Sequence, residues 1–232
     1  MFRLIKRGKF IVYLLLSCFI ISSLFSGCGS KEEKEKDNDT VQVQQSADTP
    51  EPAVLSADQL AAKGKAVDGF TYDYVMTLPD GSKLNQKVWV EAGKMRIEIK
   101  DPSNNNTMVS IANFAAGEVY FYQPEIKQAM KMPIESSEID TTSPKDYLEE
   151  FAPANTQFIK KDLVDGKQCS VYEMKIDKET STIWIWEDFG LPLRAEIQQD
   201  GGKLIVEFLN LKLGDIDDAM FTLPKDTEIV IL

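Results

Sequence analysis

The residue types in this chain that could do covalent or acid–base chemistry are few. Its 232 residues include 37 Asp and Glu and three Cys, but no His. Without an imidazole, a Ser-His-Asp triad, a Cys-His pair, a histidine metal site and a histidine pH switch are all excluded. Three classes remain: an enzyme that uses carboxylates, an enzyme that uses a lone thiol, and a protein that binds a partner or ligand without chemistry.

The thiol and carboxylate candidates have simpler structural explanations. Cys169 lies within a predicted strand with no imidazole to lower its pKa, and such a cysteine is usually a small buried hydrophobe. Asp215, Asp217 and Asp218 lack the EF-hand spacing, because Met220 stands where that motif requires glycine, and Asp217 can cap a short helix instead. A carboxylate pair for glycoside hydrolysis stays open, since acids are plentiful. We nevertheless predict a non-enzymatic protein with no catalytic residue, metal site or cofactor.

The N-terminus has the pattern of a bacterial lipoprotein signal. Residues 1–9 hold four cations and no acid, an apolar run extends from Phe10 to Phe25, and Ser26-Gly27-Cys28 follows. These are the charged region, apolar region and small-residue cleavage site of a secretory signal. Cys28 is therefore the predicted lipid-attachment residue, acylated for example with palmitate. An uncleaved anchor is the alternative, but this apolar run makes only ~24 Å of helix against a hydrocarbon core of ~30 Å.

Cleavage at this position divides the chain into three predicted segments. Residues 1–27 are a signal peptide, residues 28–55 a disordered charged tether and residues 56–232 a folded domain. Removing the four cations of the signal leaves 22 cations against 37 anions, and this net charge of −15 argues against a nucleic-acid partner. With Cys28 acylated, Cys169 is the only free thiol. We expect a monomer anchored by its N-terminal lipid on the extracytoplasmic side of the cell membrane, on the outer face of a Gram-positive membrane or the periplasmic face in a Gram-negative.

The folded part is predicted to be mostly β. Ser56 and Gln59 form a capping-box pattern before a short helix, and Ser143-Pro144 begins another inside an acidic stretch, 133–155. From Phe70 onward the apolar residues recur with a period of two between turn residues. We expect about ten or eleven antiparallel strands in a single highly curved sheet, an incomplete barrel closed by two or three short helices.

Some predicted strands are apolar on both faces. In Thr182–Glu187, for example, Trp184 and Trp186 oppose Ile183 and Ile185. Because an antiparallel sheet usually keeps one face wet, helices, a partner or a ligand must cover the second face. A curved sheet around helices can leave an apolar cavity, for which methionine is an adaptable lining, although methionine also fills ordinary core gaps. The candidate ligand-binding residues are Tyr72, Tyr74, Met76, Val88, Met95, Ile97, Val109, Ile111, Phe121, Met130, Met132, Trp184 and Trp186.

Six short segments, taken in order, carry a family resemblance. They are Lys87-Val88-Trp89-Val90, Gly93-Lys94-Met95-Arg96-Ile97, Glu118-Val119-Tyr120-Phe121-Tyr122 with Pro124, Asp165-Gly166-Lys167 with Cys169, Trp184-Ile185-Trp186 before Gly190-Leu191-Pro192-Leu193, and Met220-Phe221-Thr222-Leu223-Pro224. Across residues 57–232 this set resembles the LolA/LolB-like lipoprotein-carrier superfamily. The resemblance implies an incomplete antiparallel barrel whose apolar interior holds acyl chains. It also implies relatives that shuttle lipoproteins, bind lipids or sense envelope stress. The soluble carriers lack an anchor, so the layout is closer to membrane-anchored receptors or Gram-positive lipid-binding lipoproteins.

These observations predict a membrane-anchored extracytoplasmic lipoprotein that binds a hydrophobic ligand for carriage or sorting. The ligand would be a lipid or the acyl chains of a lipidated protein, held by burial of methylene groups at ~0.8 kcal/mol each. The alternative is an envelope sensor or protein-interaction module with a filled core and no ligand. An open apolar cavity would favour the first function, and a filled one the second.

Overall fold

The computed structural model describes the folded part of the chain. The described residues are 55–134, 143–149, 151, 155–176, 179–199 and 201–231. The predicted signal peptide, Cys28 and all of the predicted tether except its last residue lie outside them. Within the described part, no helix is both long enough and apolar enough to span a bilayer.

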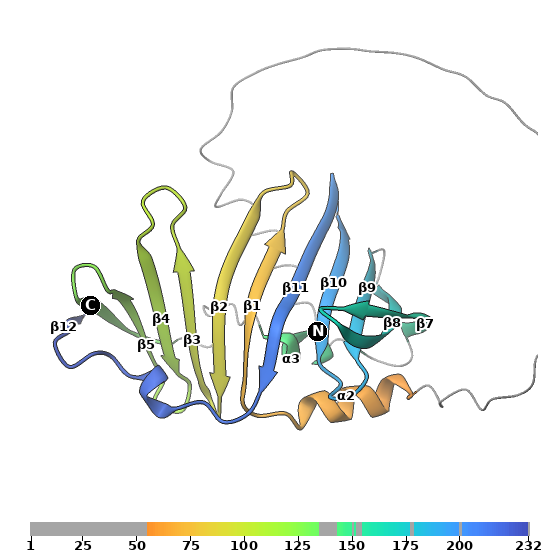
Figure 1. The fold of residues 1–232 in the computed structure, drawn as a ribbon, viewed down its shortest axis with the longest axis horizontal. Coiled ribbons are helices and arrows are strands. Elements are labelled where there is room, and N and C mark those ends of the chain that lie inside the picture. The colour runs from red at the N-terminus through yellow and green to blue at the C-terminus, as the bar shows by residue number, and fades with distance from the viewer. Residues whose placement is uncertain are drawn as a thin grey trace, which may run out of the picture. The chain divides into compact units, whose positions relative to one another are not determined.

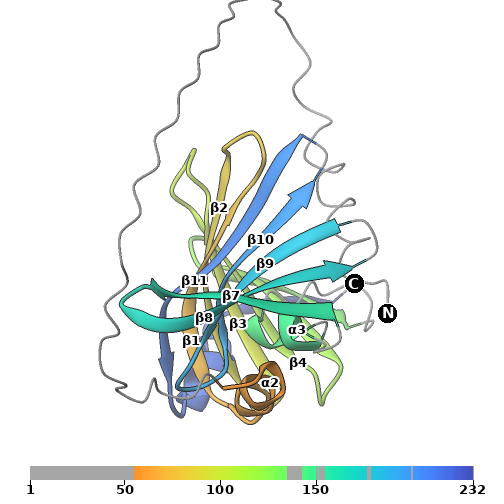
Figure 2. The same ribbon diagram turned by 90° about the vertical axis from the view of Figure 1, so that its right-hand side faces the viewer.

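Twelve strands form one sheet. Their bounds are β1 Phe70–Thr77, β2 Lys83–Glu91, β3 Lys94–Lys100, β4 Thr107–Asn113, β5 Glu118–Gln123, β6 Gln128–Pro133, β7 Thr156–Val164, β8 Lys167–Ile176, β9 Glu179–Trp186, β10 Pro192–Gln199, β11 Gly202–Leu213 and β12 Glu228–Ile231. The spatial order is β12-β6-β5-β4-β3-β2-β1-β11-β10-β9-β8-β7, so β12 and β7 are the two edges. The sheet curves strongly without closing on itself (Figure 1, Figure 2).

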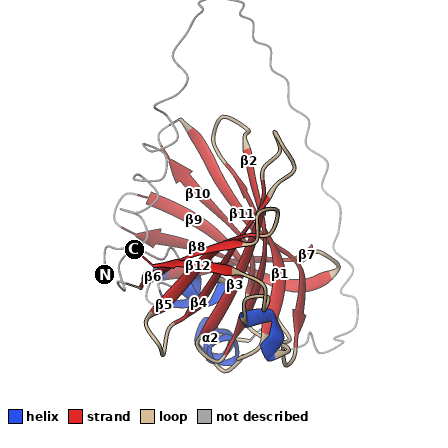
Figure 3. Cartoon of the chain, turned by 90° about the vertical axis from the view of Figure 1, so that its left-hand side faces the viewer, coloured by secondary structure: helices blue, strands red, loops and turns tan. Residues whose placement is uncertain are grey.

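Among the described residues, three short helical elements accompany the sheet: α2 (Ala57–Lys65), α3 (Pro144–Glu149) and the 3-10 helix η3 (Asp218–Phe221). At the start of α2, the Ser56 hydroxyl oxygen accepts the Gln59 N–H at 3.3 Å, and the Gln59 side chain accepts the Ser56 N–H at 2.9 Å, which is the predicted capping box. The carboxylate of Asp217 caps η3 by accepting the Ala219 N–H at 2.9 Å. Figure 3 shows the helices beside the strands of the sheet.

The predicted architecture is confirmed, with one correction to the strand count. A mostly β chain, a single curved sheet that stays open and a few short helices were all expected. The additional strand is β12, which pairs with β6 in parallel, from Glu228 with Gln128 to Ile231 with Lys131. Its four residues are too few to show an apolar period, and parallel pairing depends on a long return of the chain rather than on a local turn.

The two faces of the sheet have different partners. The ring of Tyr147 in α3 lies 5.6 Å from the ring of Phe208 in β11, and Phe208 in turn contacts Tyr72 and Tyr74 of β1. We call the face that packs against α2 and α3 the inner face. Since paired residues of antiparallel neighbours point to the same side, the register assigns the inner residues of each strand.

The hydrophobic core forms two clusters. The larger cluster includes Phe70, Tyr72 and Phe208, all at most 1% exposed, together with Leu60 of α2 and Leu148 of α3. The smaller cluster lies on the outer face and contains Val109, Ile111, Tyr122, Ala129 and Phe221, so η3 and its flanking residues cover β4, β5 and β6 from outside. This second cluster explains why β4 and β5 are apolar on both faces. On β8 and β9 the outer face instead carries Cys169, Val171 and Trp184, which belong to the larger cluster.

Candidate functional site

The inner face of β3 to β6 and β12 carries an apolar surface that is partly exposed. In the register, Ile97 lies opposite Ser110, Ser110 opposite Phe121, Phe121 opposite Met130, and Met130 opposite Val230. Phe121, Met130 and Val230 are 37%, 39% and 43% exposed. The row crosses five strands, and its apolar side chains on β5, β6 and β12 remain accessible. Such an accessible apolar surface is unusual for a sheet face and indicates a binding surface. We call this row, from Ile97 to Val230, the open row.

On the inner face, the exposure of the side chains increases along the strands from the α2 end toward the β3–β4 turn. The neighbouring row toward α2, which contains Met95, Ala112, Val119 and Met132, is buried or half-buried in the larger core cluster. On the other side of the open row, Ile99 lies opposite Met108, and Met108 is 47% exposed. The inner face is therefore closed at the end where α2 lies and open at the end of the β3–β4 turn (Figure 1).

The structure places nine of the thirteen predicted ligand-binding residues on the inner face. Five of them are buried in the larger core cluster: Tyr72, Tyr74, Met76, Val88 and Met95. The other four, Ile97, Phe121, Met130 and Met132, lie in the open row or directly beside it. The prediction thus combined residues that fill the interior with residues that remain accessible.

Four predicted residues lie on the outer face instead. Val109 and Ile111 are buried beneath η3, because the strand alternation that turns Met108 and Ser110 inward turns these two outward. Trp184 and Trp186 pair with Val171 and Cys169, also outside. Apolar character alone did not separate the faces here, because protein covers both of them.

The two tryptophans on the outer face have polar partners. Trp184 donates its Nε1–H to Asp162 Oδ2 at 3.1 Å, and the Arg194 guanidinium lies 5.2 Å from the Trp184 ring centroid. The Lys160 ammonium, and then the Trp184 N–H, lower the pKa of Asp162 to about 2. Trp186 donates to Asp188 Oδ2 at 3.1 Å. These contacts hold the indoles against the protein.

Sequence reasoning missed two inner-face residues. Ile99 continues the alternation of Met95 and Ile97 in β3, so its side was predictable, but it was left out of the candidate set. Val230 belongs to β12, the strand that the sequence did not reveal. Both add apolar area to the accessible part of the inner face.

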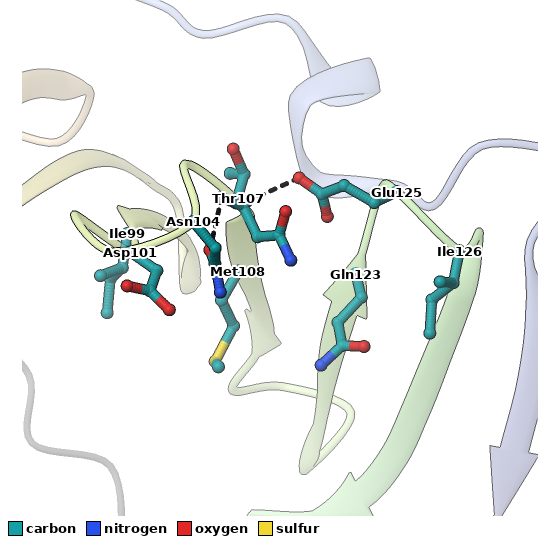
Figure 4. A pocket seen from close by; sticks show the side chains of 9 residues that line it. Ile99, Asp101, Asn104, Thr107, Met108, Gln123, Glu125 and Ile126 are labelled. Atoms are coloured by element: carbon teal, nitrogen blue, oxygen red, sulfur yellow. Dashed lines mark hydrogen bonds between the residues drawn. The ribbon is translucent and has the colours of Figure 1, made fainter.

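A pocket of about 230 Å³ lies at the open end of this face, between the β3–β4 and β5–β6 turns. Figure 4 shows the side chains of Met108, Gln123 and Ile126 pointing to the same side. The backbone N–H of Thr107 donates to Glu125 Oε1 at 2.7 Å and so ties the two turns together. The full lining is Ile99, Asp101, Asn104, Asn106, Thr107, Met108, Gln123, Glu125 and Ile126.

Several carboxylates of the described residues are in ion pairs. Glu196, for example, contacts Arg194 at 2.7 Å and Lys203 at 2.8 Å. In the described ranges, no three Cys, Asp or Glu side chains are grouped so that they could hold a metal ion.

Cys169 is fully buried in β8, and loss of solvation raises the pKa of its thiol to about 12. In a protein of residues 28–232 with Cys28→Ser, Cys169 is the single thiol. We expect this thiol to react with an aromatic disulfide reagent at pH 8 at least about 100-fold more slowly in the native than in the unfolded protein, because the thiolate is the reactive form. Stopped-flow absorbance with and without denaturant measures both rates. Prompt reaction of the native protein would show that the thiol is accessible.

Known proteins resemble this chain in fold but not in sequence. No family model and no curated protein sequence matches the chain. An uncharacterized conserved protein from Thermus thermophilus superposes with a TM-score of 0.51 at 13% identity, over 76% of this chain and 99% of that one. The chain therefore shares the fold of that protein.

Two further solved structures are more distant in shape. A LolA superfamily protein from Nitrosomonas europaea has a TM-score of 0.36 at 15% identity, over 73% of this chain and 98% of its own. The lipoprotein LppX from Mycobacterium tuberculosis has a TM-score of 0.44 at 13% identity, over 70% of this chain and 100% of its own. Identities this low carry no argument about function, which has to be argued from the inner face.

Proposed function

We propose that this chain is a membrane-anchored extracytoplasmic lipoprotein whose LolA/LolB-like domain binds a hydrophobic ligand for carriage or sorting. In this proposal residues 1–27 are removed, Cys28 carries the lipid, residues 28–55 form the tether and residues 56–232 form the binding domain. The observation that carries the proposal is the open row on the inner face, where Phe121, Met130 and Val230 remain accessible side by side.

The open row suits a flexible chain of methylene groups. Met130 in the open row and Met108 beside it are unbranched and polarisable, so they can adapt to alkyl chains of different length. Each methylene that leaves water on this surface contributes ~0.8 kcal/mol. Binding would thus be passive, and transfer to or from a membrane would follow from the difference in burial between the two sites.

A second candidate function rests on the other half of the inner face. Phe208, Tyr72, Tyr74 and Tyr147 fill the space between β1, β11 and α3 with ring contacts of 5.4 to 5.8 Å. A filled interior of this kind favours the envelope sensor or protein-interaction module. In that case the open row would contact a protein partner rather than acyl chains.

Aspartate substitutions in the open row test whether this surface binds a ligand or serves only the fold. We expect Phe121→Asp and Met130→Asp each to weaken binding of a fluorescent C16 fatty acid at least about tenfold, because a carboxylate would have to lose its hydration against an alkyl chain. The protein is the unacylated mature chain with Cys28→Ser, delipidated before titration. Fluorescence titration gives the affinity, and native mass spectrometry gives the stoichiometry.

Ile159→Asp is the matched control. Ile159 is 48% exposed, similar to Met130, but lies on the edge strand β7 at the opposite end of the sheet. It should bind like the parent, and all three variants should retain the parent's circular dichroism spectrum. If the parent binds neither the fatty acid nor an uncharged amphiphile with an alkyl chain, acyl-chain binding is wrong and the protein-interaction module becomes the better explanation.

A further inference from the structure

The pocket at the open end of the inner face continues the apolar surface. Ile99 and Met108 line the pocket and also belong to the inner face beside the open row. Ile126, at 57% exposed, extends the apolar lining to the β5–β6 turn. An amphiphile whose chain lies along the open row would therefore place its polar group in this pocket.

The ionised groups that line this pocket are both acids. Asp101 and Glu125 carry the charge, and no Lys or Arg is among the lining residues. Asp101 Oδ1 accepts the backbone N–H and the hydroxyl of Ser103 at 2.8 and 2.6 Å, which keeps this carboxylate in its charged form. Glu125 uses one oxygen for the Thr107 N–H. The pocket is thus negative at neutral pH and rich in hydrogen-bond acceptors.

The lysines nearest in sequence to Asp101 and Glu125 are not part of the pocket lining. Lys100 alternates with Ile99 in β3 and therefore lies on the outer face. Lys127 in the β5–β6 turn bonds to Asp226 Oδ2 at 2.6 Å, outside the pocket lining. Neither neutralises the two carboxylates of the pocket.

A separate acceptor on the same face lacks a donor. Gln86 lies on the inner face opposite Ile99, and its buried Oε1 atom has no hydrogen-bond partner within the described residues. A buried acceptor without a donor is unfavourable, so a ligand that brings an N–H would gain by meeting it. Gln86 does not line the pocket, but like the two carboxylates it favours a ligand that donates hydrogen bonds.

Given the proposed function, on which this step rests, we propose that the ligand of the open row is an amphiphile with a cationic amine head group, bound at Asp101 and Glu125. An ammonium group could pair with the carboxylate of Asp101 or with that of Glu125, and it donates N–H bonds. A phosphate head group would bring negative charge to two acids and further acceptors to a site that already has an excess of them. The pocket therefore selects among amphiphiles by the charge of the head group.

Three amphiphiles with the same C12 chain test this selectivity below their critical micelle concentrations. They are dodecylammonium, dodecyl maltoside and dodecyl phosphate, titrated calorimetrically into the unacylated Cys28→Ser mature chain. We expect dodecylammonium to bind about fivefold to tenfold more tightly than dodecyl phosphate at low ionic strength, since two exposed charge pairs each contribute modestly. The ratio should shrink toward one as salt rises above about 0.5 M.

The double variant Asp101→Asn with Glu125→Gln should abolish the preference. Asp80→Asn is the matched control, because Asp80 accepts the same two bonds from Ser82, at 2.9 and 2.6 Å, in the β1–β2 turn outside the pocket lining. The control should keep the preference. Equal or tighter binding of dodecyl phosphate or dodecyl maltoside in the parent, or a preference that survives the double variant, would overturn the head-group assignment. If none of the three probes binds, the proposed function itself fails.

Discussion

Gly190→Ala is expected to destabilise the domain by roughly 3 to 5 kcal/mol, as measured by equilibrium unfolding in urea. Gly190 has φ +71°, which costs about 1–2 kcal/mol for a residue with a Cβ. A Cβ there would also overlap the Leu60 carbonyl oxygen and lie 2.7 Å from the Gly64 nitrogen. Helix α2 would have to move away, and re-exposure of the fully buried Leu60 side chain would cost about 1.5–3 kcal/mol more.

Gly166→Ala is the matched control for this substitution. Gly166 also has φ +71°, but nothing lies within 4 Å of the position that its Cβ would take. Its expected cost is therefore only the backbone contribution of about 1–2 kcal/mol. Equal losses of unfolding free energy in the two variants would show that α2 packs less closely on the β9–β10 turn than it does in the structure. A larger loss for Gly190→Ala would confirm that this contact holds the closed end of the inner face.

The parts of the fold that depend on local patterns were predictable from the sequence. Phe70, Tyr72, Tyr74 and Met76 alternate along β1, and all four are buried on the inner face as the period of two requires. The capping box before α2 also follows from residue types at fixed spacing.

The site was less predictable because it depends on contacts between distant segments. Val109 and Ile111 are more apolar than their neighbours Ser110 and Ala112, which favoured them as ligand-binding residues. They face outward because Phe221, more than a hundred residues later in the chain, covers them. The pocket is formed by two turns joined through Thr107 and Glu125, a pairing that no sequence period reveals.

Phe208→Ala is expected to cost about 3–5 kcal/mol, the usual range for removing a buried aromatic ring. Phe208 is fully buried and contacts the rings of Tyr72, Tyr74 and Tyr147, so three neighbours would border the space left behind. Equilibrium unfolding in urea measures the loss. A loss below about 1 kcal/mol would mean that α3 does not pack on β11, and the filled half of the inner face would have to be reassigned.

Phe121→Ala should cost little stability and weaken ligand binding, whereas Phe208→Ala should cost much stability and leave binding unchanged. This contrast tests whether the inner face is divided into an accessible half and a filled half. Phe121 is 37% exposed, so Phe121→Ala should cost less than half as much stability as Phe208→Ala while weakening binding of the C16 fatty acid. Phe208→Ala, measured where it is still folded, should bind the fatty acid like the parent. If Phe208→Ala alone lost affinity, the ligand would enter between the sheet and α3, and the open row would not be the binding surface.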